Sequence, residues 1–307
     1  MANLVNYAQE WKTELLPIIM DGSYLSPFIV SNVEWLDHKT FNFTRMATSG
    51  YKPHSLLGGW NRGSVKQYNH PYTVEHDRDV EFFIDKREMD ESKRTMTISN
   101  TNSVFTETQM TPEIDAQGFS RFASYAISAG LDDQFDVTTY TSDNVLVRLK
   151  GMIGKVRRYR NKGLVGYIAP EIVDALSLCK EFTRTIDVIS LVDSASGKAV
   201  ETRITSLDGV YLVEVLDQDR FYTEFDFTDE FVPGIGAFKI NALFLTPQTS
   251  SIVPKIESIY VFNPGEHSQG DGGLYQNRAH WDSFNFPNGK DGAYDSIFCE
   301  YDTEAVV

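Results

Sequence analysis

Two predicted strands joined by a long connection constrain the fold of this chain more than any other feature. Residues 40–46, TFNFTRM, alternate Phe41 and Phe43 with polar residues, and residues 71–85 alternate less regularly, so both segments are predicted to be strands. A connection as long as the one between them is uncommon in a compact domain and is typical of a functional or partner-bound loop. Because two strands joined in this way are not stable alone in water, the hairpin must lie against another surface.

The composition of the connection indicates which surface that is. Residues 47–70 are rich in Gly, Ser and Asn, yet they include Leu56, Leu57 and Trp60. Apolar side chains gathered at the tip of a projecting loop are typical of a protein–protein contact. We therefore expect this tip to lie on another subunit.

A helix is predicted to begin at TPEIDAQGFSRFASYA. Thr111 is expected to cap it, Pro112 fits the first helical position, and Gly130 is expected to end it. Glu113 and Asp115 fall in the first turn, where unpaired backbone amides favour negative charge. Two carboxylates two residues apart on a helix point in different directions, whereas a glycosidase needs them facing each other across a bond. We interpret the pair as acids that stabilise the helix start, not as a catalytic acid pair.

The rest of the chain mixes helices and strands. A short amphipathic helix is predicted over residues 4–16 and another from Pro170, and residues 183–262 are predicted to be mainly β. Residues 280–286 and 293–301 are two further strand-like runs joined by PNGKDG, which is a strong hairpin signal. The predicted fold class is α+β.

A further helix, predicted from Val145 to Tyr159, has a basic exposed side. It could be an ordinary solvated face, a contact with an acidic neighbour or a DNA contact. The chain's 28 basic and 43 acidic residues give a net charge of −15, which disfavours binding to a phosphate backbone and makes attraction between subunits available. We weigh the first two interpretations equally and DNA below them. The basic residues are Arg148, Lys150, Lys155, Arg157, Arg158, Arg160 and Lys162.

Motifs of catalysis and cofactor binding are missing from the sequence. It contains no HExxH, GxSxG, paired CxxC or Rossmann fingerprint, and GMIGKVRR has the wrong spacing for a P-loop. Cys179 and Cys299 lie far apart, as expected for free thiols in a reducing cytoplasm, and no apolar run is long enough to span a bilayer. We therefore expect a protein that is not an enzyme, binds no cofactor or metal, and does not enter a membrane.

The order of these elements resembles the major capsid proteins of tailed bacteriophages, which share the Hong Kong 97-type fold. The strongest match is VEHDRDVEFFIDKREMDES, residues 74–92, followed by TPEIDAQGFSRFA, residues 111–123. The resemblance extends more loosely through NYAQEW near the start, INALFLTPQTSSIVPKIESIYVF and DSFNFPNGKDGAYDSIF. It therefore covers most of the chain.

The resemblance implies four parts. They are an N-terminal arm over residues 1–38, an extended E-loop over 39–80, a peripheral domain over 81–135 and 276–307 with a spine helix at 112–129, and a mixed α/β axial domain over 136–275.

The resemblance also implies a function. A protein of this family would assemble through pentamers and hexamers into an icosahedral shell around double-stranded DNA, in the cytoplasm of a host bacterium, and would end in the virion. Its partners would be copies of itself, a scaffolding protein and a portal, and it would hold DNA without sequence-specific binding. Because large apolar residues and arginines are the usual anchors of such contacts, the expected inter-subunit residues are Leu56, Leu57, Trp60, Lys66, Arg78, Arg157 and Arg158. Some relatives cross-link covalently through an E-loop lysine, for which Lys52 and Lys66 are the candidates.

Two other functions stay open. An encapsulin-like nanocompartment would have the same fold and would enclose cargo enzymes instead of DNA. A β-rich carbohydrate-active protein is suggested by Trp60, Trp281 and the acidic composition, and it would be a monomer with a sugar-binding cleft. Oligomeric state and particle contents distinguish the three.

Overall fold

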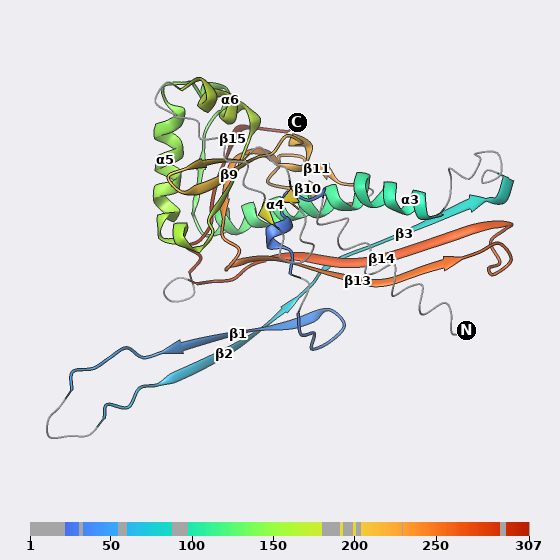
Figure 1. Cartoon of the computed structure of the whole chain (residues 1–307), viewed down its shortest axis with the longest axis horizontal. Coiled ribbons are helices and arrows are strands. Elements are labelled where there is room, and N and C mark those ends of the chain that lie inside the picture. The colour runs from blue at the N-terminus through green and yellow to red at the C-terminus, as the bar shows by residue number, and fades with distance from the viewer. Residues whose placement is uncertain are drawn as a thin grey trace.

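One long helical run lies between two sheets, and a two-stranded hairpin projects away from them (Figure 1). The computed structural model describes residues 22–30, 33–54, 60–87, 98–179, 191–192, 199–200, 204–228, 230–288 and 293–306. The predicted helix at 4–16 and most of residues 183–203 lie outside these ranges. The mixture of helices and sheets confirms the predicted α+β class.

The larger sheet has six strands and is covered by helices on both faces. Along its strand β12 (Phe238–Leu245), Leu243 and Leu245 face a core that includes α4 (Thr111–Ser128). Ala242 and Phe244 face a core that includes α5 (Val145–Val156) and α6 (Pro170–Leu178). This alternation follows from the two-residue period of a strand. The strand order is β4 (Asp132–Gln134), β15 (Phe298–Ala305), β12 (Phe238–Leu245), β5 (Val165–Ile168), β9 (Val210–Glu214) and β8 (Ile204–Leu207).

The smaller sheet has three long antiparallel strands. β14 (Gly272–Asn285) lies in the middle, with β13 (Ser250–Phe262) on one side and β3 (His76–Asp85) on the other. α4 packs against β14, and its residue Phe122 shares one core with Trp281 of that strand. The helix therefore joins the two sheets into one body.

The helical run begins earlier than the sequence predicted. α3 (Ile98–Phe105) and a π-helical turn, η2 (Thr106–Met110), lead without a break into α4. Thr111 is itself helical and its N–H bonds to the carbonyl of Thr106, so the prediction that it caps a helix start is wrong. Pro112 lacks an N–H and would clash inside a regular α-helix, and the π turn ends at Met110, two residues before it. Gly130 follows the helix with a left-handed φ of 66°, as expected.

The projecting hairpin consists of β1 (Thr40–Thr48) and β2 (Val65–Thr73), which pair from Thr40↔Thr73 to Thr48↔Val65. Both predicted strands exist, but the run at 71–85 is divided between β2 and β3 at Val74 and Glu75. Strand pairing also extends into the predicted connection, which leaves residues 49–64 as the tip.

The hairpin predicted for the last two runs is not formed. β14 is paired along both edges, so it has no edge for β15, which instead lies between β4 and β12. The local turn signal is overridden by twelve residue pairs between β14 and β13 and ten between β14 and β3.

Shorter elements complete the description. They are η1 (Ser26–Phe28), η3 (Val137–Thr139), η4 (Arg157–Lys162), β6 (Leu191–Val192), β7 (Ala199–Val200), η5 (Gln218–Arg220), β10 (Phe225–Asp226) and β11 (Val232–Pro233). Within the described ranges, none of the helices combines the length and apolar character that a membrane span requires.

Candidate interaction surfaces

The projecting hairpin, residues 38–74, is called the arm below. An aromatic cluster fixes its root to the three-stranded sheet: Phe43 stacks on Phe286 with ring centroids 4.0 Å apart, and Phe41 lies edge-on to Phe284. Val74, where the arm returns to the body, is fully buried in the same cluster. The root is therefore part of the packed body, while the strands beyond it project (Figure 1).

Charged groups fix the root a second time. The Asp77 carboxylate lies 3.0 Å from the Lys39 ammonium and 2.8 Å from the Arg278 guanidinium, and its other oxygen lies 3.1 Å from Nδ1 of His280. Hydrogen bonds from Arg278, followed by those from Lys39, hold the pKa of Asp77 well below its usual range. The start of β1 and the start of β3 are thereby held together, which sets the direction of the arm.

The tip of the arm presents aromatic side chains to solvent. Trp60 is 94% exposed and Tyr51 is completely exposed. The tip is closed by a backbone hydrogen bond from Ser49 N–H to the Ser64 carbonyl, and the Asn61 amide donates to the Pro53 carbonyl. Leu56 and Leu57 lie outside the described residues. Lys66 lies on β2, and its side chain is also outside the description.

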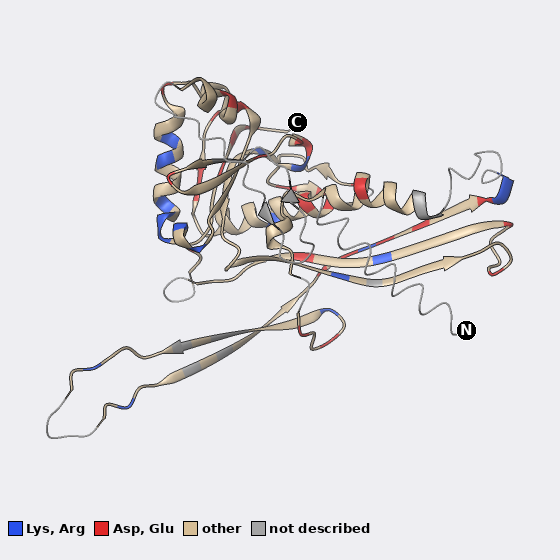
Figure 2. Ribbon diagram, viewed as in Figure 1, with Lys and Arg blue, Asp and Glu red and all other residues tan. Residues whose placement is uncertain are grey.

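The arm and the body carry opposite charge. Residues 38–74 contain five basic residues and neither Asp nor Glu, which leaves 23 basic and all 43 acidic residues for the rest of the chain. The arm is thus formally +5 and the remainder −20. In Figure 2 the ribbon of the arm has blue segments beyond the ends of β1 and β2 and no red segment, whereas red segments are spread over the body. The basic residues of the arm are Lys39, Arg45, Lys52, Arg62 and Lys66.

Asp115 is a buried anchor point and not a first-turn acid. Its carboxylate is completely buried and accepts hydrogen bonds from the Ser23 hydroxyl at 2.5 Å and from the Tyr24 backbone N–H at 3.0 Å. The Arg220 guanidinium lies 3.3 Å away. Burial raises the pKa of Asp115, while Ser23 and Arg220 act in the opposite direction. Asp115 therefore fastens the segment before η1 and the end of η5 to α4.

Glu113 points to a different part of the molecule. Its carboxylate lies 2.7 Å from Nε of Arg78 and 3.2 Å from Nε2 of His76, both on β3. The interpretation of the two acids as helix-start stabilisers is wrong because the helix does not start there, but the expectation that they point apart is confirmed. Arg78 also donates to the Phe227 carbonyl at 2.5 Å, so its guanidinium ties β3 to α4 and to the segment after β10.

The basic face along α5 and η4 is partly engaged by its own chain, and Figure 2 shows its basic positions as blue segments of the ribbon along α5. Arg148 donates to buried Glu300 at 2.6 Å and its guanidinium lies 3.4 Å from the centre of the Phe135 ring. Arg158 pairs with Asp295 at 2.8 Å, although its side chain stays 77% exposed. Arg157 is exposed. The basic face therefore has two parts: Arg148 is paired with a buried carboxylate, whereas Arg157 and Arg158 are exposed to solvent.

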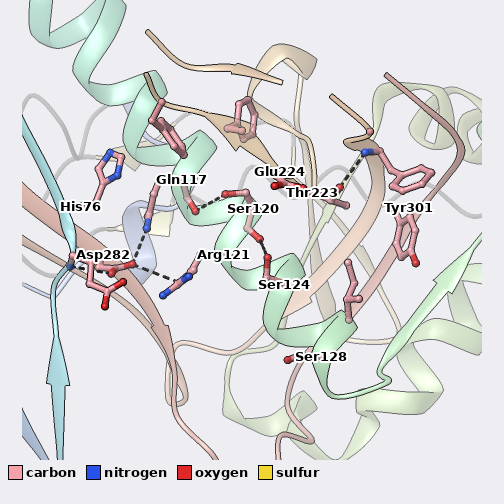
Figure 3. Close-up of a pocket in the computed structure, with 16 residues that line it drawn as sticks. His76, Gln117, Ser120, Arg121, Ser124, Ser128, Thr223, Glu224, Asp282 and Tyr301 are labelled. Carbon is pink, nitrogen blue, oxygen red and sulfur yellow. Dashed lines mark hydrogen bonds and ion pairs between the residues drawn. The ribbon is translucent and has the colours of Figure 1, made fainter. Parts of the chain in front are cut away.

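Two hollows lie end to end along the helical run. The first, called the groove, has a volume of about 750 Å³ and runs beside α4 (Figure 3). Figure 3 shows Ser120, Ser124 and Ser128 along its helical side, with Asp282 at one edge and Glu224 at another. The second, called the cavity, has a volume of about 340 Å³. It lies beside α3, η2 and the beginning of α4, between strands β3 and β14 and the segment that precedes β11.

The structure bears on the other functions that the sequence left open. Trp281 is only 2% exposed, so it cannot serve as a stacking platform for a sugar, and that argument for a carbohydrate-active protein is wrong. Across the described part of the chain, no group of three His, Cys, Asp or Glu side chains is placed to hold a metal ion.

Several important residues were not found by sequence reasoning. Glu300 is completely buried, accepts from the Tyr140 hydroxyl and pairs with Arg148, and burial raises the pKa of its carboxyl group. The Ser23 and Arg220 partners of Asp115 are 92 and 105 residues away in the chain. The only sequence signal for Glu300 is its position in an otherwise apolar strand run, IFCEY, where a charged residue must find a partner.

No protein-family model matches the chain. No curated protein matches it either. Solved structures do match. The capsid structure of the cyanophage P-SCSP1u superposes with a TM-score of 0.58 at 11% identity and covers 91% of this chain and 87% of its own. The mature capsid of bacteriophage PhiM1 superposes with a TM-score of 0.57 at 13% identity, and the match covers 92% of this chain and 87% of the PhiM1 chain. A structure from Mycobacterium phage Adephagia superposes with a TM-score of 0.56 at 11% identity, and the match covers 92% of this chain and 91% of the other. The chain therefore has the tailed-phage capsid fold.

Proposed function

We propose that this chain, which has the fold of phage capsid proteins, is the major capsid protein of a tailed bacteriophage. In this role it assembles through pentamers and hexamers into an icosahedral shell that encloses double-stranded DNA. The observation that carries the proposal is the extent of the match: about nine-tenths of the chain follows a fold whose solved examples include phage capsids. A structural role needs interfaces rather than a reaction centre.

The same four parts are proposed, with boundaries adjusted to the strand pairing. Residues 250–285 are grouped with the peripheral domain because β13 and β14 pair with β3. Residues 298–305 are grouped with the axial domain because β15 pairs with β12. The arm corresponds to the E-loop, and α4 corresponds to the spine helix.

Contacts between subunits are proposed to use the arm and the exposed part of the basic face. Trp60, with Leu56, Leu57 and Lys66, would contact the neighbour on which the arm lies. Arg157 and Arg158 would approach acidic surface on another copy, since most of the chain's acidic residues lie in the body. Arg78, which ties β3 to Glu113 and Phe227, would hold the base of the arm in the orientation that assembly needs.

The net charge suits a container for DNA. A chain with a charge of −15 repels the phosphate backbone over most of its surface, so the genome can be packed without adhering to the wall. We place the mature protein in the virion, after assembly in the bacterial cytoplasm with a scaffolding protein and a portal as partners.

Assembly tests the proposal. The chain, expressed with the genes that neighbour its own, is expected to form closed shells in negative-stain electron micrographs, and nuclease-protected DNA is expected inside shells from a phage infection. A matched control replaces residues 50–63 by Asn-Gly, a two-residue turn that suits the antiparallel pair closed at Ser49 and Ser64. This control should keep the melting temperature of the unassembled subunit but form no shells. A chain that stays monomeric with every neighbouring gene present would overturn the proposal, and shells filled with a cargo protein instead of DNA would favour the nanocompartment.

A further inference from the structure

We propose that Trp60 at the tip of one copy's arm inserts into the cavity beside α3, η2 and α4 of a second copy. This inference rests on the proposed shell function and names the receiving site, which that function leaves unspecified.

The cavity has the lining and size for one large aromatic side chain. Four aromatic residues from four separate elements or segments line it: Phe82, Phe105, Phe231 and Trp281. A volume of about 340 Å³ is at the lower end of the range for ligand pockets, which suits a single ring system better than an extended peptide. Aromatic rings prefer edge-on or offset contacts with one another, and the partly exposed rings of Phe82, Phe105 and Phe231 offer such contacts to an indole.

The charges of the tip and the rim are complementary. Trp60 is followed two residues later by Arg62 and shares the tip with Lys52, and the arm contains no acid. The rim of the cavity contributes three carboxylates, from Asp79, Glu113 and Glu230, against the single guanidinium of Arg78. Such complementarity orients an approaching partner and speeds its encounter.

The paired strands of the arm, without the tip, are nearly as long as the part of the helical run that lines the two hollows. Nine paired residues at about 3.4 Å each extend roughly 31 Å, and the run from residue 105 to residue 128 extends roughly 35 Å at 1.5 Å per residue. The groove lies along residues 117–128 and the cavity along residues 105–113. A second copy's strands lying beside the groove would therefore place their tip at the cavity.

Only another copy's arm can make this contact. Figure 1 shows β1 and β2 running from the body in the direction away from α3, so the arm of one chain points away from that chain's own cavity. The root contacts at Asp77 and Phe286 hold that direction.

A disulfide trap tests the assignment in assembled particles. Asn61→Cys, next to an intact Trp60, is combined with Gln109→Cys, an exposed position on the cavity lining, and the particles are oxidised and run on a non-reducing gel. The expected result is a ladder of covalent oligomers that each single variant lacks. Asn61→Cys with Glu230→Cys, on another side of the rim, is a second pair in case the first fails to assemble. The matched control is Asn61→Cys with Ser128→Cys, which lies at the far end of the groove and should not cross-link.

A second measurement uses no new cysteine. Trp60→Ala is expected to weaken subunit association about 30-fold, as loss of a central aromatic anchor typically does, whereas Tyr51→Ala, equally exposed on the same tip, should change it less than threefold. Shells that form normally but cross-link at Ser128 and not at the cavity would overturn this inference and leave the shell function standing. Equal effects of the two alanine variants would overturn it as well. A wild-type chain that never assembles would overturn both proposals.

Discussion

At the scale of single residues, the molecule depends on acids whose partners are remote in sequence. Asp115 is the clearest case, because one buried carboxylate joins α4 to the segment before η1 and, through Arg220, to η5. Glu300 does the same between β15 and α5. Breaking such a pair leaves the other partner buried without compensation, which is usually far costlier than the pair's own net contribution.

Asp115→Ala is therefore expected to lower the free energy of unfolding of the unassembled subunit by about 3 to 5 kcal/mol, because Ser23, the Tyr24 N–H and Arg220 all lose their acceptor. The measurement is a urea unfolding curve at neutral pH. Asp133→Asn is the matched control: its carboxylate also pairs with an arginine, Arg148, but at 3.5 Å and with 49% of the side chain exposed. It should cost less than about 1 kcal/mol. A loss at Asp115 no greater than at Asp133 would contradict the anchor role.

At the scale of elements, η1 and α4 approach each other closely at a glycine. A Cβ atom added at Gly118 would lie 2.4 Å from Cδ1 of Leu25 and 3.2 Å from Cδ1 of Ile252, and both of those side chains are completely buried. The missing side chain thus lets the segment around η1 and strand β13 pack directly on the helix.

Gly118→Ala is expected to destabilise the subunit by a net of about 1 to 2 kcal/mol, since the overpacking cost exceeds the gain in helix propensity. Gly151→Ala in α5 is the control and is expected to stabilise the subunit. A Cβ atom there meets nothing within 4 Å, so the gain in helix propensity of up to about 1 kcal/mol is not offset by a clash. Thermal unfolding of the two variants beside the wild type checks both signs. Stabilisation by Gly118→Ala would show that Leu25 can move aside.

Helices and strands with a regular apolar pattern could be predicted from the sequence. The strands of the arm and α4 were recognisable because apolar residues such as Phe41, Phe43 and Phe122 repeat with the period of their element. The start of the helical run was missed because α3 and η2, ISNTNSVFTETQM, carry few apolar residues, while Thr111 and Pro112 imitate a helix start. Their helical state depends on packing against β3 and β14, for example of Phe105 on Phe82.

Long-range pairing explains the other differences. PNGKDG is a good local turn signal, but the position of β15 is decided by β4 and β12, which no local pattern reveals. Of the candidate interaction surfaces, the tip with Trp60 was predicted because apolar residues stand in a loop rich in Gly, Ser and Asn. The cavity was not, since its lining comes from four separate stretches of the chain, and only the folded structure brings Phe82, Phe231 and Trp281 together.

At the scale of the whole molecule, charge is separated between the arm and the body. Copies with a net charge of −15 repel each other at long range, while the basic arm of one attracts the acidic body of the next. Salt screens both terms, because the Debye length falls from about 10 Å at 0.1 M to about 3 Å at 1 M. Salt alone therefore cannot separate the attraction of the arm from the overall repulsion, and the two are separated by comparing the assembly rates of charge variants.

Lys52→Gln with Arg62→Gln should slow assembly at least about tenfold at 0.1 M salt, followed by light scattering, and the ratio of wild-type to variant rates should approach one at 1 M. Lys86→Gln with Arg87→Gln makes the same charge change at exposed positions outside the arm and should give a much smaller ratio at low salt. If both pairs slow assembly equally, net charge alone governs association and the arm has no special electrostatic role.

The place of β15 in the six-stranded sheet has a consequence for biosynthesis. Residues 298–305 are translated after every other strand of that sheet, yet they lie inside it, between β4 and β12. Until they emerge from the ribosome, the neighbouring edges are unpaired and the core lacks Phe298 and Cys299, which are completely buried. The six-stranded sheet can be completed only after β15 has been made. A chain interrupted before residue 298 therefore lacks the strand that joins β4 to β12, and the core on both sides of that sheet stays incomplete.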